Sequence, residues 1–223
     1  MINIICILWV GVFRGRNFTI NDIVRLYELV KKNIDRPFNF YCLSNYPFHF
    51  PHLPIKRIPL KHGYPGWWSK VELHRPDLPK GRTLYLDLDT HIVGSLKPIL
   101  DYPGDLVMFG SRATGRGLGL VHRYQAATML FDSGTRVMRE FYDRFRMNAE
   151  HWMEKYRSEQ DIMGDWIPRQ PTFPHEWMLK LNNCKNMTAL PKGVIIVTGQ
   201  PKDISFRDTE KIKWYNNQKP IIT

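Results

Sequence analysis

The sequence lacks a hydrophobic run long enough to cross a membrane. Its longest apolar stretch, 4–13, is about half of the roughly 20 residues that a membrane-spanning helix needs. No basic segment precedes this stretch and no small-residue cleavage site follows it, which argues against a signal peptide. We therefore expect a cytoplasmic protein with no transmembrane segment.

Cysteine is scarce, and histidine lacks the spacing of metal ligands. Cys6, Cys42 and Cys184 are odd in number and far apart, and two of them fall in expected buried strands. A buried free thiol behaves as a small hydrophobic side chain, so neither disulfides nor a zinc site is expected. The sequence also contains no Ser-His-Asp order, phosphate-binding P-loop or dinucleotide fingerprint.

Acidic residues are few relative to basic ones. With 32 lysines and arginines against 21 aspartates and glutamates, the net charge is +11. A positive field concentrates phosphates, nucleic acids and anionic membrane surfaces, so an anionic partner is expected. Arg112, Arg116 and Arg123, set among glycines, are candidates to contact it. The alternative is a basic, solvated surface that has no partner.

The rest of the composition is that of an ordinary folded domain. The 223 residues are 43% hydrophobic and contain no repeat, which fits a single domain, 1–223, with a helical tail at about 203–223. Apolar, β-prone runs alternate with segments of helical spacing, and this predicts an α/β fold with a mostly parallel central sheet flanked by helices. The expected strands are 2–12, 38–43, 54–58, 83–89, 91–93, 106–110, 127–132 and 194–198, and the expected helices are 19–30, 67–75, 135–156 and 158–166.

Two aspartates at the end of a buried run are the sharpest local signal. Asp87 and Asp89 follow Leu84-Tyr85-Leu86, and alternation along a strand would place both carboxylates on one side. Two such carboxylates suit Mg²⁺ or Mn²⁺, because both ions prefer oxygen ligands. The alternative is an aspartate pair that only forms hydrogen bonds in a turn.

Several motifs, in order along the chain, resemble the GT-A-fold glycosyltransferases. The similarity is greatest to the glycogenin and lipopolysaccharide-galactosyltransferase type and its bacterial and phage relatives. The motifs are Cys6-Ile-Leu-Trp-Val-Gly, Gly66-Trp-Trp-Ser-Lys-Val-Glu-Leu, Arg82-Thr-Leu-Tyr-Leu-Asp-Leu-Asp, Leu130-Phe-Asp-Ser-Gly, Ser158-Glu-Gln-Asp and Thr198-Gly-Gln-Pro-Lys. Together they cover most of the chain, and the resemblance implies a GT-A, Rossmann-like domain.

The resemblance implies a divalent ion that bridges the two phosphates of a nucleotide-sugar donor, with a uridine nucleotide the first expectation. The implied metal ligands are Asp87, Asp89 and Thr198, where Thr198 stands in place of the family's histidine. A hydroxyl is a weaker ligand than an imidazole, so an altered metal dependence is expected. The other residues implied to contact the donor are Trp9, Gly11 and Arg14 at the base, and Lys70, Gly199 and Lys202 at the phosphates.

The resemblance also implies which residues lie at the reacting sugar. Glu159, Gln160 and Asp161 would lie near the anomeric carbon, and Asp132 stands where the family has an asparagine. For Glu159 and Asp161, an acidic first helical turn that interacts with the helix dipole is the alternative.

The resemblance implies a metal-dependent, retaining glycosyltransferase, and we expect it in bacterial or phage-infected cytoplasm. The charge of +11 favours a polyanionic acceptor, and 5-hydroxymethylpyrimidine in phage-type DNA is the first choice. Lipopolysaccharide or another envelope glycan is the alternative, and only that acceptor would require peripheral contact with a membrane. A third possibility is a non-catalytic nucleic-acid-binding protein on the same fold.

Overall fold

A seven-stranded sheet forms the centre of the computed structural model, which describes residues 1–13, 18–110, 124–184, 187 and 189–199. The strand order is β3-β2-β1-β4-β7-β6-β8. Only β7 runs against its neighbours, so the expected α/β fold with a mostly parallel sheet is confirmed. The strands are β1 (Ile2–Leu8), β2 (Phe38–Ser44), β3 (Ile55–Pro59), β4 (Gly81–Leu86), β6 (Leu106–Gly110), β7 (Tyr124–Ser133) and β8 (Thr172–Phe173).

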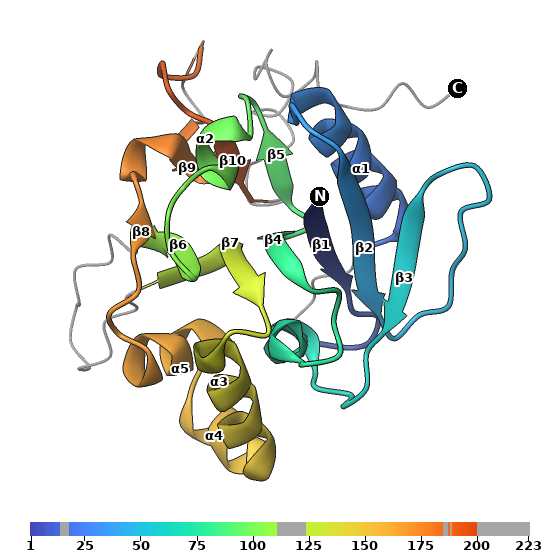
Figure 1. Ribbon diagram of the computed structural model, residues 1–223, viewed down its shortest axis with the longest axis vertical. Coiled ribbons are helices and arrows are strands. Elements are labelled where there is room, and N and C mark those ends of the chain that lie inside the picture. Colours follow the sequence, from blue (N-terminus) through green and yellow to red (C-terminus); the bar gives the residue numbers. More distant parts are fainter. Residues whose placement is uncertain (14–17, 111–123, 185–186, 188, 200–223) are drawn as a thin grey trace.

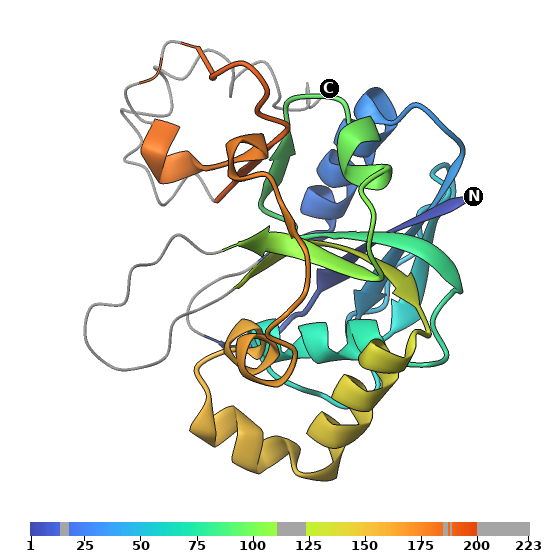
Figure 2. The same ribbon diagram turned by 60° about the vertical axis from the view of Figure 1, so that its left-hand side comes forward.

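Helices cover both faces of this sheet (Figures 1 and 2). Helices α1 (Ile20–Asn33) and α2 (Lys97–Leu100) pack on one face around a core that includes Ile4, Leu26 and Leu84. The other face carries a second core and four helical segments. These are the 3₁₀ helix Gly66–His74, α3 (Arg136–Met147), α4 (Ala149–Lys155) and α5 (Glu159–Trp166).

A second, three-stranded sheet lies beyond the carboxyl end of β4. It contains β5 (Thr90–Ile92), β10 (Ile196–Thr198) and β9 (Met178–Lys180), with β10 in the middle. Because β10 pairs with β5, the chain around residue 198 lies beside the turn that follows β4. Two short 3₁₀ helices, His175–Trp177 and Leu181–Cys184, flank β9.

The first strand is shorter than predicted and ends at Leu8 instead of residue 12. Beyond it, the side-chain amide of Asn45 accepts a hydrogen bond from the Val10 N–H and donates one to the Val10 carbonyl, both at 2.8 Å. A side chain therefore satisfies the backbone groups that a continued strand would have paired.

The predicted helix 135–156 is two helices. Asn148, with φ −152° and ψ 56°, separates α3 from α4. Beyond this break, Trp152 of α4 packs edge-on against Trp166 of α5, at 5.0 Å between ring centroids. The segment 67–75, predicted as a helix, forms a 3₁₀ helix at Gly66–His74.

Among the described residues, no helix is long and apolar enough to span a bilayer. The predicted tail 203–223 and the arginines Arg112, Arg116 and Arg123 lie outside the described residues.

Candidate active site

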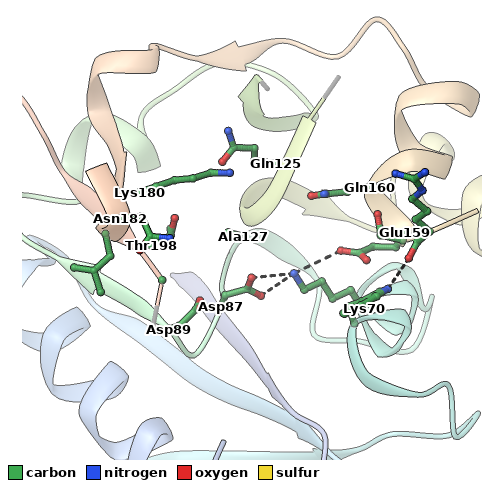
Figure 3. Close-up of a pocket in the computed structure, with 15 residues that line it drawn as sticks. Lys70, Asp87, Asp89, Gln125, Ala127, Glu159, Gln160, Lys180, Asn182 and Thr198 are labelled. Atoms are coloured by element: carbon green, nitrogen blue, oxygen red, sulfur yellow. Dashed lines mark hydrogen bonds and ion pairs between the residues drawn. The ribbon is translucent and has the colours of Figure 1, made fainter. Parts of the chain in front are cut away.

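A cleft of about 550 Å³ opens where β4 and β7 meet the second sheet (Figure 3). Four separate parts of the chain form its walls: the 3₁₀ helix Gly66–His74, the turn after β4, the start of α5, and the ends of β9 and β10. The lining residues are Trp67, Lys70, Asp87, Asp89, Gln125, Ala127, Arg157, Ser158, Glu159, Gln160, Lys180, Leu181, Asn182, Thr198 and Gly199.

Asp87 and Asp89 lie in the turn between β4 and β5, not in the strand as predicted. The strand ends at Leu86, and the Thr90 N–H closes the turn on the Asp87 carbonyl at 3.0 Å. Arg25 of α1 holds the turn from behind, because its guanidinium donates hydrogen bonds to the carbonyls of Leu88 and, at 3.0 Å, Thr90. The two aspartates therefore do not share one face of a strand, as predicted, although both line the cleft.

Lys70 forms ion pairs with two carboxylates across the cleft. Its ammonium lies 2.9 Å from Asp87 and 3.5 Å from Glu159 (Figure 3). Burial alone lowers the pKa of Lys70, but the charges of Asp87 and Glu159 outweigh burial and hold that pKa above its usual value. The hydroxyl of Tyr85 also donates to the Asp87 carboxylate.

Glu159 and Gln160 enter the cleft from the first turn of α5. Burial raises the pKa of Glu159 to about 7, with Lys70 opposing the rise and Asp87 adding to it. This carboxyl group therefore changes its protonation near neutral pH. The Gln160 side-chain oxygen accepts a hydrogen bond from the Ala126 N–H at 3.3 Å, which fixes the amide against β7.

The second sheet brings Thr198 and Gly199 to the aspartate turn. The Gly199 N–H donates to the Asp89 carbonyl at 3.1 Å, and Thr198 pairs in register with Thr90. Asp87, Asp89 and Thr198 thus present three oxygen-bearing side chains to one cleft, although Asp87 and Thr198 are 111 positions apart in the sequence.

An aromatic pocket of about 110 Å³ adjoins the cleft. It shares Trp67, Lys70, Asp87 and Asp89 with the cleft, so the two hollows are continuous. Its other lining residues include Ile7, Trp9, Phe13, Phe18 and Leu88. The Phe13 ring packs edge-on against Trp67 at 4.6 Å and lies so close over Gly66 that a Cβ there would come within 1.9 Å of it. A flat apolar group suits such walls.

The structure brings together most of the residues predicted for the site. Lys70, Asp87, Asp89, Glu159, Gln160, Thr198 and Gly199 line the cleft, and Trp9 lines the aromatic pocket. Gly11 lies under the Trp9 ring, where an added Cβ would be 2.3 Å from a ring carbon. Arg14 and Lys202 lie outside the described residues.

Asp132 and Asp161 are not among the residues that line the cleft. Asp132 lies at the far end of β7 and forms an ion pair with Arg82 at 3.0 Å. Asp161 is buried in α5, where its carboxylate accepts a hydrogen bond from the Ser158 hydroxyl at 3.2 Å. That contact fits the helix-start reading of the Ser158 motif.

Several cleft residues were not predicted from the sequence. Gln125 lies at the start of β7, and Lys180 and Asn182 flank the end of a three-residue strand. No periodic pattern marks so short a strand, so nothing local signalled that these side chains reach the site. Arg157 precedes the helix start at Ser158, and proximity to that motif was its only signal.

The site offers oxygen atoms, the type of ligand that a hard divalent cation prefers. Asp87, Asp89 and Thr198 supply two carboxylates and one hydroxyl, which Mg²⁺ and Mn²⁺ accept. Within the described ranges, no group of three or more histidine, cysteine, aspartate or glutamate side chains is placed to hold an ion. A cation at this position would therefore need Thr198 or a substrate oxygen to complete its ligands.

Solved structures match the whole architecture. The galactosyltransferase LgtC, crystallised with donor and acceptor sugar analogues, has a TM-score of 0.64 at 14% identity, over 96% of this chain and 95% of LgtC. The fold is that of the GT-A glycosyltransferases.

Two larger enzymes share this GT-A fold. Glycosyltransferase GlyE of Streptococcus pneumoniae matches with a TM-score of 0.61 at 11% identity, and the bifunctional glycosyltransferase WbbM with 0.59 at 11%. The matches cover 87% and 97% of this chain but only 54% of GlyE and 51% of WbbM. No protein-family model and no curated protein sequence matches the chain.

Proposed function

We propose that the protein is a glycosyltransferase that moves a sugar from a nucleotide sugar, of the uridine type, to a hydroxyl group. The observation that carries this proposal is the pair of continuous hollows, one aromatic and one polar, that share Lys70, Asp87 and Asp89. The parts of a nucleotide sugar match these hollows in the same order: a flat base, a charged diphosphate and a polar sugar. The GT-A fold supports the assignment.

In the proposed complex, the base lies in the aromatic pocket beside Trp9 and Phe13. The diphosphate then lies over Asp87 and Asp89, and the sugar extends toward Glu159 and Gln160, the residues at the start of α5. Glu159 and Gln160 hold the sugar hydroxyls and stabilise positive charge at the anomeric carbon, in a reaction that retains the anomeric configuration. Asp161 and Asp132 do not line the cleft and act only indirectly, through the start of α5 and the far end of β7.

Asp87, Asp89 and Thr198 would hold a divalent ion, Mn²⁺ or Mg²⁺, beside the diphosphate. When bound, such an ion supplies positive charge that stabilises the departing diphosphate. Lys70 keeps the Asp87 carboxylate in place at 2.9 Å, and Arg25 fixes the backbone of the turn. These contacts pre-organise the carboxylates before the substrate arrives.

For the acceptor we propose a 5-hydroxymethylpyrimidine in DNA. The support is electrostatic: a net charge of +11 draws a polyanion to the protein. An enzyme of this kind would work in the cytoplasm of a bacterium or a phage-infected host.

A sugar hydroxyl of an envelope glycan, including lipopolysaccharide, is the second candidate acceptor. The observation that favours it is the match over 96% of this chain to a galactosyltransferase crystallised with an acceptor sugar analogue. An acceptor at an anionic membrane would also use the positive charge, through peripheral contact.

Mass spectrometry tests the proposed acceptor. DNA containing 5-hydroxymethylcytosine or 5-hydroxymethyluracil is incubated with the protein, Mn²⁺ and a panel of nucleotide sugars, and its nucleosides are then analysed. A mass gain of one sugar on one base supports the proposal and names the donor. Hydrolysis of a nucleotide sugar without a DNA product would move the acceptor to a glycan. DNA binding with neither reaction would indicate a non-catalytic nucleic-acid-binding protein.

Asp89→Ala tests the metal and donor assignment. We expect sugar transfer or donor hydrolysis to fall at least about 100-fold, because the variant loses a carboxylate that holds the charge-stabilising ion. DNA binding should remain within about twofold, since it depends on the wider basic surface. Normal turnover by this variant would refute the assignment of Asp89.

A further inference from the structure

Lys180 is a cation at the edge of the cleft that sequence reasoning did not identify. It is the last residue of β9 and pairs in register with Thr198 of β10, so the two residues are direct neighbours in the second sheet. Figure 3 shows its side chain reaching into the cleft from the wall that carries Thr198 and Asn182, in the direction of Gln125.

The cations of the cleft differ in whether protein carboxylates already neutralise them. Lys70 is buried and shared between Asp87 and Glu159, at 2.9 and 3.5 Å. Lys180 is exposed, and within the described part of the chain it forms no ion pair with a carboxylate. The same holds for Arg157, on the opposite wall beside α5. Lys180 and Arg157 are therefore the described cleft cations with charge available for a ligand.

Lys180 and Arg157 lie on different walls of the cleft. Thr198 reaches the aspartate turn through the Gly199 N–H, which binds the Asp89 carbonyl at 3.1 Å. Since Lys180 is the neighbour of Thr198, it lies on the wall nearest to Asp89, where the diphosphate is proposed to bind. Arg157 lies on the side of the cleft where the sugar is proposed to bind, beside Glu159 and Gln160.

We infer that Lys180 binds the diphosphate of the nucleotide sugar and stabilises its charge as the sugar leaves. The inference rests on the proposed function. In that reaction the bond from the anomeric carbon to the phosphate oxygen breaks, and its electron pair stays on the diphosphate. The acceptor oxygen bonds to the anomeric carbon, and the acceptor proton passes to the departing diphosphate. An ammonium group beside the diphosphate stabilises the charge that develops there.

The neutral hydroxyl at position 198 gives Lys180 its importance. A threonine adds no charge to the site, and the lysine beside it supplies a positive charge that does not depend on an ion. The protein should therefore bind a nucleoside diphosphate measurably without a divalent cation, and Lys180 should account for much of that binding.

Calorimetric titration of nucleoside diphosphates, first without and then with Mn²⁺, tests the inference. The probes are UDP, GDP, ADP and dTDP, with the matching nucleosides as controls. For the best-bound diphosphate, Lys180→Met should weaken metal-free binding about 10-fold and leave nucleoside binding unchanged. The turnover number of the transfer reaction should fall about 10-fold or more at an unchanged acceptor KM. Lys56→Met, at an exposed position of β3 away from the cleft, is the matched control and should match the wild type.

The outcomes separate this inference from the proposed function. If the wild-type protein binds no nucleoside diphosphate under either condition, the proposed function and the inference about Lys180 are both overturned. If the wild type binds one and Lys180→Met binds it equally well, only the inference about Lys180 is overturned. An increased acceptor KM in Lys180→Met with unchanged diphosphate affinity would also overturn it, because Lys180 would then contact the acceptor.

Discussion

Lys70 is the residue on which the carboxylates of the cleft depend. It is only 14% exposed, and its ammonium balances Asp87 and a buried Glu159. A buried carboxylate without a compensating charge is costly, so Lys70 affects the stability of the site as well as its chemistry.

Lys70→Met should lower the free energy of unfolding by about 2 kcal/mol, because it removes one partner of a largely buried ion pair that retains some contact with solvent. Urea denaturation measures this change. Adding Glu159→Gln to Lys70→Met should restore part of the loss, since the amide needs no counter-charge. Lys97→Met breaks an exposed pair with Asp101 and should change stability far less, because solvent screens both charges. Equal losses in Lys70→Met and Lys97→Met would contradict this account.

His74 gives the protein a specific sensitivity to acid. The side chain is buried between Phe131 and Phe141, and burial lowers its pKa to about 3. The unfolded chain binds a proton at this residue below a pH of about 6.5, whereas the folded protein does not until about pH 3. Between these values, each unit of acidification removes up to about 1.4 kcal/mol of stability through this residue.

His74→Phe should therefore flatten the fall in stability between pH 6 and pH 4. The unfolding free energies of both proteins, measured by urea denaturation across this range, give two slopes. The wild-type slope should exceed that of the variant by up to about 1.4 kcal/mol per pH unit, because the carboxylates that also titrate are common to both. Parallel curves would show that His74 takes up a proton in the folded protein.

At the scale of elements, the side chain of Asn45 holds the segment after β1 in place. Asn45, just beyond β2, binds both backbone groups of Val10 at 2.8 Å and so positions the chain between Trp9 and Phe13, which line the aromatic pocket. This clamp ends the strand and shapes the pocket at the same time.

Asn45→Ala should weaken nucleotide binding about 5- to 10-fold with little loss of stability, because the two hydrogen bonds are at an exposed site. Titration calorimetry with UDP and thermal unfolding measure the two effects. Asn39→Ala is the control, since Asn39 donates to Asn3 at the other end of β2 and should not change nucleotide affinity. If both variants lose affinity equally, the clamp does not shape the pocket.

The sequence predicted elements best where burial imposes a regular pattern. Strands β1, β2 and β6 were placed within a few residues, because their apolar runs are buried on both faces. Strands β8 and β9 were missed because no apolar run marks them, whereas the equally short β5 and β10 adjoin the apolar residues Val93 and Ile195. The break at Asn148 was missed, because Phe141, Phe145 and Trp152 keep helical spacing across it.

The candidate site divides in the same way. Asp87, Asp89, Lys70 and Glu159 were predicted because their motifs resemble those of a known fold, and the structure places all four in one cleft. Lys180 was not, because its position follows from the pairing of β9 with β10. No local pattern in the sequence around position 180 indicates that Lys180 pairs with Thr198.

At the scale of the whole molecule, the excess of basic residues is the dominant property. The net charge of +11 acts on any polyanion before a specific contact forms. If DNA is the acceptor, its affinity should follow the release of counterions from the phosphates.

The association constant for a short hydroxymethylated duplex should fall by about 10- to 1,000-fold between 50 and 200 mM salt, for a protein that makes a few to several phosphate contacts. Fluorescence anisotropy at stepped salt concentrations measures the slope. Uridine binding in the aromatic pocket is the internal control and should change less than about twofold, because that contact is uncharged. A flat salt dependence for the duplex would argue against DNA as the acceptor.

The position of β1 inside the sheet, between β2 and β4, sets an order of events during synthesis on the ribosome. Its partner β2 is complete at residue 44, but its other partner, β4, is complete only at residue 86, 42 residues later. At ordinary translation rates the nascent chain therefore spends roughly 2 to 8 s with one edge of an apolar strand unpaired, a state prone to aggregation. Because β10 joins the aspartate turn only after residue 196 has emerged, the cleft is completed long after the sheet that supports it.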